Sequence, residues 1–229
     1  MTARESLGAA RLYGIVDLAY ISAEHAPRVA AQMIEGGVDV LQLRAKDESP
    51  MRIQNLARLL HPILRASAVP FIINDHPEIA AAVDCEGVHV GQDDASVVMA
   101  REFGGAGRIV GKSTHDLTQA EAAAAEGADY IGFGPLFPTP TKPGRPAIGT
   151  ADIHEVHRRV SIPVFCIGGV KLENLAAIVA AGARRVVMVS GILEADDIAN
   201  YIRQAKALLP DLRDTERKNG RASPAGEPG

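Results

Sequence analysis

Short runs of β-branched and other apolar residues alternate along the chain with longer stretches in which apolar residues recur at helical spacing. The short runs predict strands, and the longer stretches, beginning with Glu24–Glu35 and Pro50–Ala66, predict amphipathic helices. Eight strands are expected, each with its helix, so the pattern predicts eight helices as well. The strands are expected at Leu12–Asp17, Val40–Arg44, Phe71–Asn74, Gly87–Val90, Ile109–Ser113, Tyr130–Gly134, Val164–Ile167 and Arg185–Val189.

Glycines mark several joints between a predicted helix and the next strand. Gly37, Gly127 and Gly182 can each supply a left-handed residue that ends a helix, and a new apolar run starts soon after. Eight such units in residues 1–210 favour a single (β/α)8 TIM barrel of the α/β class over a doubly wound sheet, which at this length more often has fewer strands and larger insertions. Residues 211–229 are polar and rich in Pro and Gly, so we expect a disordered tail.

Composition and charge narrow the class of protein. The 229 residues are 47% apolar, and 24 Lys and Arg stand against 28 Asp and Glu, a net charge of −4. This balance provides no basic field for nucleic acid or for an anionic membrane. The start of the chain lacks a signal-peptide pattern and no run approaches the ~20 apolar residues of a membrane helix, so a cytoplasmic location is expected. The two cysteines, Cys85 and Cys166, have no metal-ligand spacing and are expected to be buried thiols.

Polar residues follow the predicted strands, and the carboxyl ends of strands are where barrels of this kind carry their chemistry. Gln42, Arg44 and Lys46 lie on one face of the second strand because side chains alternate with a period of two. Two cations and an amide facing inward are costly without an anionic partner. This cluster therefore predicts a phosphate or carboxylate ligand.

Carboxylates end the next two strands. Asp75 follows the third strand, and Asp93 and Asp94 follow the fourth. Mg²⁺ is commonly held by one or two protein carboxylates together with substrate phosphate oxygens and water. Asp75 with one of the other two carboxylates predicts a magnesium site, and the spacing does not decide which of the two faces inward. Helix capping is the alternative role for these residues.

A second anion site is predicted on the opposite side of the barrel. The longest connection runs from Pro135 to Gly149, and its Thr139, Thr141 and Lys142 offer hydroxyls and a charge suited to phosphate. The seventh and eighth strands end in Gly168-Gly169 and Ser190-Gly191, where small residues let backbone N–H groups approach an anion.

Two apparent motifs carry no prediction of function. Gly111-Lys112-Ser113-Thr114 resembles the end of a phosphate-binding P-loop, but the strand leads directly into Gly111 and the first glycine of that motif is missing. His154 and His157 are three residues apart rather than four, so they do not form a zinc-protease helix. His115 follows the fifth strand, where it could face the site or serve as a structural histidine.

Two phosphate pockets in one barrel, one of them suited to a metal-bound diphosphate, indicate a transferase that releases pyrophosphate. No Cys, Ser or Lys in these motifs has an evident general base beside it, so a covalent intermediate on the protein is not expected. Catalysis would rest on positioning two substrates and on neutralising the charge of the departing group.

Six ordered segments between Leu12 and about Leu193 resemble the thiamine phosphate synthase family. These are Leu41–Lys46, Ile73–Asp75, Gly87–Asp94, Gly132–Pro135 with Thr139–Lys142, Ile167–Val170 and Val189-Ser190. The resemblance implies that the chain joins a hydroxymethylpyrimidine diphosphate to a thiazole phosphate. It further implies that the diphosphate leaves first, that the thiazole nitrogen captures the resulting pyrimidine cation, and that carbon dioxide is also lost from a carboxylated thiazole.

The same resemblance assigns residues to each ligand. The metal ligands would be Asp75 and Asp94 rather than Asp93, and the catalytic residues Arg44, Lys46, Ser113 and Lys142. The pyrimidine diphosphate would be held by Gln42, Arg44, Lys46, Asn74, Ser113 and Lys142. The thiazole phosphate would be held by Thr139, Pro140, Thr141, Gly169, Val189 and Ser190.

Two alternatives remain open from the sequence. A thiazole tautomerase would share the barrel and the thiazole phosphate pocket and could use His115 for proton transfer, but it would lack the complete metal and diphosphate set. A non-catalytic sensor of phosphorylated ligands would bind without turnover. The sequence does not indicate the oligomeric state, the preferred thiazole tautomer or a second activity in the pathway.

Overall fold

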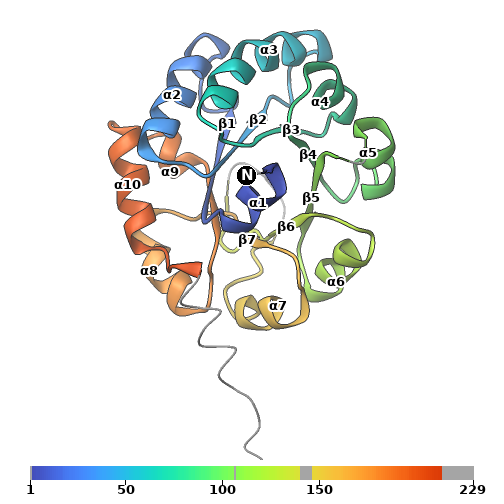
Figure 1. Ribbon diagram of the computed structural model, residues 1–229. Coiled ribbons are helices and arrows are strands. Elements are labelled where there is room, and N and C mark those ends of the chain that lie inside the picture. Colours follow the sequence, from blue (N-terminus) through green and yellow to red (C-terminus); the bar gives the residue numbers. More distant parts are fainter. Residues whose placement is uncertain (1, 106, 140–145, 213–229) are drawn as a thin grey trace, which may run out of the picture.

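The protein folds as a closed barrel of eight parallel strands arranged in chain order, β1 to β8. The computed structural model describes residues 2–105, 107–139 and 146–212 (Figure 1). The predicted barrel is therefore confirmed, with strand ends that differ from the expected ones by one residue at most. The strands are β1 Leu12–Asp17, β2 Val40–Arg44, β3 Phe71–Asn74, β4 Gly87–Val90, β5 Ile109–Thr114, β6 Tyr130–Phe133, β7 Val164–Cys166 and β8 Val186–Met188.

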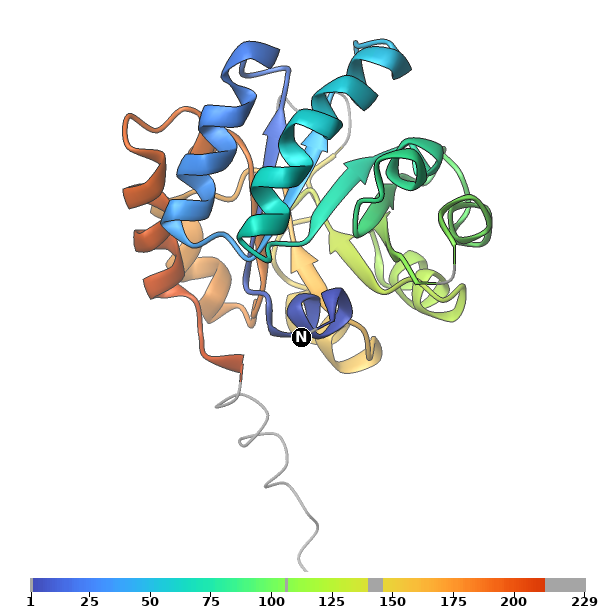
Figure 2. The same ribbon diagram turned by 45° about the horizontal axis from the view of Figure 1, so that its top comes forward.

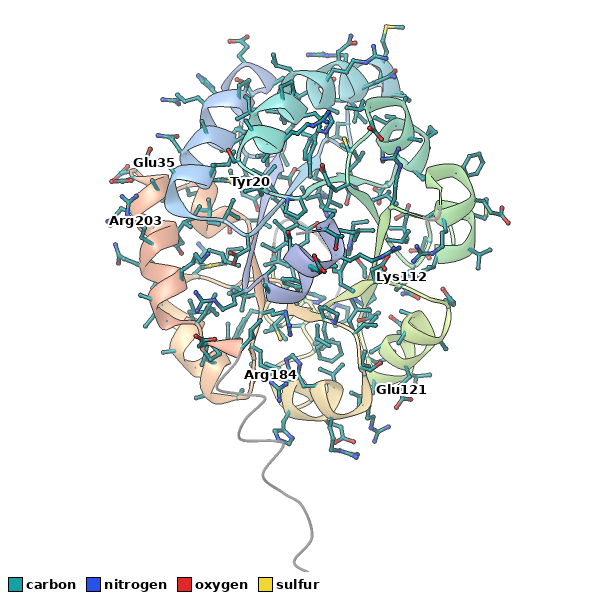
Figure 3. All side chains as sticks on the ribbon, viewed as in Figure 1. Tyr20, Glu35, Lys112, Glu121, Arg184 and Arg203 are labelled. Carbon is teal, nitrogen blue, oxygen red and sulfur yellow. The ribbon has the colours of Figure 1, made fainter. Side chains whose placement is uncertain are left out.

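Helices form the outer layer, and each covers the strands beside it (Figure 1). The principal helices are α2 Ala26–Gly36, α3 Pro50–Ala66, α4 Pro77–Val83, α5 Val97–Gly104, α6 Leu117–Ala125, α7 Ile153–Arg159, α8 Leu172–Ala180 and α10 Ile198–Leu208. Ion pairs join some neighbours at the surface, such as Arg203 with Glu35 at 3.9 Å between α10 and α2 (Figure 3). Glu121 and Arg159 pair at 3.4 Å between α6 and α7.

The expected number of eight helices is wrong for the part of the chain that the structure describes. Two further α-helices are present, α1 Ala3–Ala9 and α9 Ser190–Leu193, and a 3-10 turn, η1 Ala23–His25, precedes α2. Thr2 and Glu5 form a capping box at the start of α1, a signal that is visible in the sequence. α9 is a single turn after β8, too short to show a helical period.

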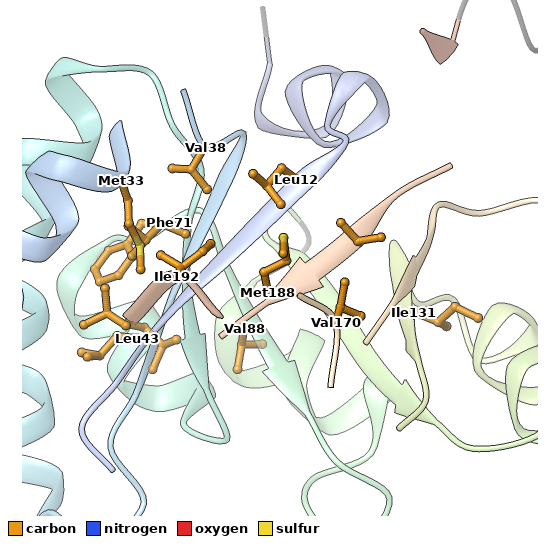
Figure 4. Packing of buried hydrophobic residues seen from close by; sticks show 14 of the residues in the cluster. Leu12, Met33, Val38, Leu43, Phe71, Val88, Ile131, Val170, Met188 and Ile192 are labelled. Atoms are coloured by element: carbon orange, nitrogen blue, oxygen red, sulfur yellow. The ribbon is translucent and has the colours of Figure 1, made fainter. Parts of the chain in front are cut away.

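The core has two parts because each strand is covered on both faces. The larger part lies between strands and helices and includes Leu43, Phe71 and Met33 (Figure 4). The smaller part fills the inside of the barrel around Tyr13, Tyr130 and Phe165, whose ring centroids lie 5.5 to 5.8 Å apart. α1 lies across the opening of the barrel (Figures 1 and 2), and its Leu7 belongs to the inner part.

Helix α1 determines which end of the barrel is open. α1 ends at Ala9 and β1 begins at Leu12, so α1 closes the end at which the parallel strands begin. The carboxyl ends of the strands are not covered by α1, and the sequence predicts the functional site at these ends. The glycines predicted to end helices do so, because Gly37, Gly127 and Gly182 have φ values of 88, 87 and 107°.

The remaining expectations concern the thiols, the tail and membrane spans. Cys85 and Cys166 are buried, so the prediction of buried thiols is confirmed, and burial raises the pKa of both thiols to about 12. The predicted disordered tail lies almost wholly outside the described residues. Among the helices that the structure describes, none has the length and apolar character needed to cross a bilayer.

Candidate active site

A cavity lies at the carboxyl end of the barrel, and its empty space, counted together with the adjoining open solvent, is about 850 Å3. Inward-facing side chains of most strands reach it because side chains along a strand alternate between the two faces of the barrel wall. The lining residues are Tyr13, Ile15, Gln42, Arg44, Asn74, His89, Ser113, His115, Tyr130, Gly132, Gly134, Pro135, Thr139, Ile167, Gly168, Gly169, Val170, Val187, Val189 and Ser190. The cavity floor is aromatic, and its rim carries the charges.

The structure brings together most of the residues predicted from the sequence. Those that line the cavity are Gln42, Arg44, Asn74, Ser113, Thr139, Gly169, Val189 and Ser190. Lys46, Asp75 and Asp94 do not line it but follow the strands whose residues do. Pro140, Thr141 and Lys142 lie outside the described residues. The expected shared face of the second strand is therefore occupied by Gln42 and Arg44, with Lys46 one step further out.

Arg44 has an anionic partner within the protein, which the sequence analysis did not anticipate. Nη1 of Arg44 donates to both carboxylate oxygens of Asp17, at 3.0 and 2.8 Å, and Asp17 is fully buried. The inward cation therefore does not by itself require a ligand to compensate its charge. Asp17 ends the first strand, so the strand-end rule applied to the other strands could have found it.

Asp75 and Asp94 follow neighbouring strands, and their carboxyl groups lie close enough for Asp94 to affect the pKa of Asp75. Burial and the adjacent Asp94 raise the pKa of Asp75 above its usual range, and Lys46, with its Nζ 3.4 Å from Asp75, opposes this only in part. Two carboxylates this close, with one ammonium group beside them, provide a negative site suited to a hard cation.

Backbone geometry holds both carboxylates in place. Asp75 has a left-handed φ of 64°, and its N–H donates to the His89 carbonyl at 2.8 Å. The Gly91 N–H donates to Oδ2 of Asp94 at 2.8 Å, and a Cβ at Gly91 would lie 2.5 Å from that oxygen. Close approach is therefore possible only because residue 91 is glycine. The contact with Asp75 also distinguishes Asp94 from Asp93, in agreement with the resemblance.

The loops after β7 and β8 present backbone donors to the cavity. The N–H groups of Gly168, Gly169, Val170 and Ser190, which line the cavity, donate to no atom in the part of the chain that the structure describes. Gly168 and Gly169 have φ values of 95 and 67°, which favour glycine. A Cβ at Gly169 would also lie 2.7 Å from Cβ of Phe137. Unpaired donors converging on one side of a cavity make a site for a phosphate group.

The sequence did not predict three residues on the floor of the cavity, Tyr13, Tyr130 and His89. Oη of Tyr13 and of Tyr130 are 2.9 Å apart, and the His89 ring lies between Tyr130 and Ser113 with 3.0 Å hydrogen bonds to both hydroxyls. Burial raises the pKa of Tyr13 and Tyr130 above the usual range, so both phenols are neutral. The alternation around His89, with Val88 and Val90 on the other face, was the signal that pointed His89 inward.

His115 lines the cavity, which answers the question the sequence left open. Its Nδ1 hydrogen-bonds to the Gly134 carbonyl oxygen, and its backbone N–H donates to Oε1 of Gln119 at 2.9 Å. A carbonyl can only accept, so Nδ1 carries the hydrogen and Nε2 is the acceptor of the neutral ring.

A (β/α)8 barrel whose cavity is lined by an arginine and unpaired backbone donors, with paired carboxylates at adjacent strand ends, belongs to the class of barrel enzymes that act on small phosphorylated molecules. Residues 12–192 match the family model described as thiamine monophosphate synthase. The chain belongs to this family, and the family resemblance inferred from the motifs is confirmed. Enzymes of this family need a metal.

Curated relatives and a solved structure support the assignment. The chain is 41% identical over 189 residues to a thiamine-phosphate synthase of Shouchella clausii, covering 82% of this chain and 90% of the relative. It is 40% identical over 200 residues to a thiamine-phosphate synthase of Chloroflexus aurantiacus, covering 87% and 92%. The crystal structure of a thiamine phosphate pyrophosphorylase from Pyrococcus furiosus superposes with a TM-score of 0.79 at 27% identity, covering 90% of this chain and 96% of the other.

Proposed function

We propose that this protein condenses 4-amino-2-methyl-5-(diphosphooxymethyl)pyrimidine with thiazole phosphate, or its carboxylated form, to give thiamine phosphate and pyrophosphate. Membership of the family supports the reaction. The observation that carries it is a carboxylate pair, suited to a metal diphosphate, at the ends of strands whose residues line the cavity, together with a separate group of unpaired backbone donors in the cavity lining, suited to a monophosphate.

The pyrimidine diphosphate would lie on the side of the cavity formed by β2 to β5. Gln42 and Asn74 offer amides to the pyrimidine, and Arg44 and Lys46 offer positive charge to the diphosphate. Ser113 on β5 lines the same side, and its carbonyl accepts from Nε2 of Gln92 at 2.5 Å, which ties the Asp94 loop to β5. Lys142, outside the described residues, would complete the set.

Asp75 and Asp94 fit Mg²⁺ by the chemistry of their donors. Both are hard oxygen ligands. They form a pair rather than a larger cluster, since the described residues contain no group of three or more His, Cys, Asp or Glu that could hold a metal. Two carboxylates that leave most coordination positions to phosphate and water are the usual way in which proteins hold Mg²⁺ on a diphosphate. When bound there, Mg²⁺ would neutralise charge on the diphosphate.

The thiazole phosphate would lie opposite, against the loops after β7 and β8. The N–H groups of Gly169 and Ser190 would donate to its phosphate oxygens, while Val189 provides an apolar contact for the ring. Thr139, which lines this side, would add a hydroxyl, together with Pro140 and Thr141 outside the described residues.

The reaction needs no nucleophile from the protein. The bond between the pyrimidine methylene carbon and the diphosphate oxygen breaks, and the oxygen keeps the electron pair. The lone pair of the thiazole nitrogen then forms the new carbon–nitrogen bond, and a carboxylated thiazole also loses carbon dioxide. Arg44 and Lys46 stabilise the leaving group, and the two phosphate sites hold the reacting atoms in line.

A turnover assay tests the proposal. Purified protein is mixed with both substrates and Mg²⁺, and pyrophosphate release and the mass of thiamine phosphate are followed, with EDTA as a control. Metal-dependent formation of both products is expected. The Asp94→Ala variant should turn over orders of magnitude more slowly while keeping its melting temperature within a few degrees, and unchanged magnesium dependence in it would remove Asp94 from the site. Isomerisation of carboxythiazole phosphate without condensation would favour the tautomerase, and ligand binding without turnover would favour the sensor.

A further inference from the structure

An unbroken chain of hydrogen bonds crosses the floor of the cavity from one strand to another. Nε2 of Gln42 on β2 donates to Oη of Tyr13 on β1 at 2.9 Å. Oη of Tyr13 contacts Oη of Tyr130 on β6 at 2.9 Å, and Oη of Tyr130 contacts Nδ1 of His89 on β4 at 3.0 Å. Nε2 of His89 contacts Oγ of Ser113 on β5 at 3.0 Å. All five residues line the cavity.

The contacts of this chain permit one common direction. Each phenol has one hydrogen, and a neutral imidazole has one N–H. The Tyr13 oxygen accepts from Gln42, which leaves its hydrogen available to Tyr130, and the hydrogen of Tyr130 is then available to Nδ1 of His89. In this direction His89 carries its hydrogen on Nε2 and donates to Ser113.

The chain is buried from Gln42 to Tyr130 and partly buried at His89. Tyr13 and Tyr130 are 1% exposed, Gln42 is 2% exposed, and both phenol rings pack edge-on against Phe165. Gly111 makes the room: a Cβ there would overlap the Tyr130 ring. The segment Gly111–Thr114, which only resembles a P-loop, therefore has a structural role, since Gly111 admits the ring and Ser113 ends the chain of hydrogen bonds.

We propose that Tyr13, Tyr130 and His89 form a positioning relay that couples recognition of the pyrimidine at Gln42 to the orientation of the Ser113 hydroxyl toward the leaving diphosphate. The proposal rests on the function proposed above and extends it to three residues that touch neither phosphate site. With its amide nitrogen held by Tyr13, Gln42 presents Oε1 to the amino group of the pyrimidine. A pyrimidine analogue that lacks this group would not favour this orientation of Gln42, and Ser113 would be less well aligned.

Kinetic coupling between Tyr130 and Ser113 tests the relay. Tyr130→Phe removes one oxygen from the middle of the chain and keeps the ring. We expect kcat to fall about tenfold or more with KM for thiazole phosphate unchanged. Ser113→Ala should cost much less in the Tyr130→Phe background than in the wild type, because residues that act as a unit are not additive. Independent, multiplicative losses would overturn the relay.

A control and a second measurement separate a positioning role from a structural one. Phe165→Leu disturbs the packing of both phenols but removes no hydrogen bond, so it should lower the melting temperature and leave the effect of Ser113→Ala on kcat intact. The same comparison is then made without turnover. The affinity for pyrophosphate with Mg²⁺ is measured by calorimetry for the wild type, Tyr130→Phe, Ser113→Ala and the double variant. If the wild type binds pyrophosphate but makes no thiamine phosphate, the proposed function is overturned. The comparison of pyrophosphate affinities still tests whether Tyr130 and Ser113 are coupled. Additive losses of pyrophosphate affinity would contradict the relay.

Discussion

Asp17 holds Arg44 at the edge of the cavity through two hydrogen bonds of 3.0 and 2.8 Å to the same guanidinium nitrogen. The two residues are partners in the β1–β2 register, and both end their strands. The side chain of Arg44 is 11% exposed and that of Asp17 is 1% exposed. A buried ion pair contributes little net stability compared with apolar residues, but it fixes the position of its members. Here it fixes the cation proposed to receive the diphosphate.

Asp17→Asn should therefore impair substrate binding more than folding. The guanidinium loses its charge partner and one acceptor oxygen, so we expect KM for the pyrimidine diphosphate to rise about tenfold or more. The free energy of unfolding should fall by about 3 kcal/mol or less, because Arg44 still reaches the cavity. Asp39→Asn is the matched control, since Asp39 pairs with Lys206 at 2.6 Å away from the cavity lining. An equal rise in KM in both variants would contradict the assignment.

Gly91→Ala should weaken the metal site without touching a metal ligand. The new Cβ would lie 2.5 Å from Oδ2 of Asp94, so the carboxylate must move and lose its bond to the backbone N–H. We expect the Mg²⁺ concentration for half-maximal turnover to rise several-fold. Gly107→Ala, at a position where a Cβ meets no atom within 4 Å, should behave as the wild type. An unchanged magnesium requirement in Gly91→Ala would show that the position of Asp94 does not matter.

Asp75→Asn should stabilise the protein in the absence of metal while abolishing its response to metal. Burial and the neighbouring Asp94 raise the pKa of Asp75, so its ionised form is disfavoured in the folded protein relative to the unfolded chain, and removal of the charge should favour folding. Asn adopts left-handed backbone more readily than most residues, so a φ of 64° is tolerated. Differential scanning calorimetry with EDTA should show a higher melting temperature than the wild type. Added Mg²⁺ should raise the melting temperature of the wild type only. A lower metal-free melting temperature would mean that the pairing with Lys46 outweighs the repulsion.

The stability of the protein should fall in mild acid because of His157 on α7. Nε2 of His157 is buried without a hydrogen-bond partner among the described residues. Burial, followed by Arg184 and Arg185, lowers the pKa of His157 to about 4 from 6.5. Between these two pKa values, His157 is therefore protonated in the unfolded chain but not in the folded chain. The stability is fully present above pH 6.5 and is lost as the pH falls toward 4, by about 3 kcal/mol over the whole window.

Denaturant unfolding at pH 7 and pH 5 measures this effect. His157→Leu should reduce the difference in unfolding free energy between the two pH values and should also remove the unpaired nitrogen. His154→Leu, one turn earlier and exposed, is the comparison and should reduce the difference much less, because His154 is the smallest of the four causes that lower the pKa of His157. If His157→Leu loses as much stability at pH 5 as the wild type, another group is responsible.

Local pattern was sufficient for the architecture and for part of the list of candidate residues. The period-two and helical repeats predict all eight strands, and the rule that chemistry lies at the carboxyl ends of strands predicts Gln42 and Arg44. The family resemblance adds Asn74 and Ser113, and all four residues line one cavity. The same rule could have found Asp17. The capping box of α1 is also visible in the sequence, but it lies outside the repeating strand and helix units.

The pairing of side chains across the barrel was decided only by the tertiary structure. Tyr13 and Tyr130 are 117 positions apart, and His89 meets Ser113 only because β4 and β5 pair in one register. The resemblance implies Asp94 rather than Asp93 as the metal ligand, and the proximity of Asp94 to Asp75, which supports this choice, appears only in the folded chain. Periodicity records which way a side chain faces, because that is a property of the local backbone. It does not record what the side chain meets, because closure of the barrel brings together residues whose separation in the chain carries no local signal.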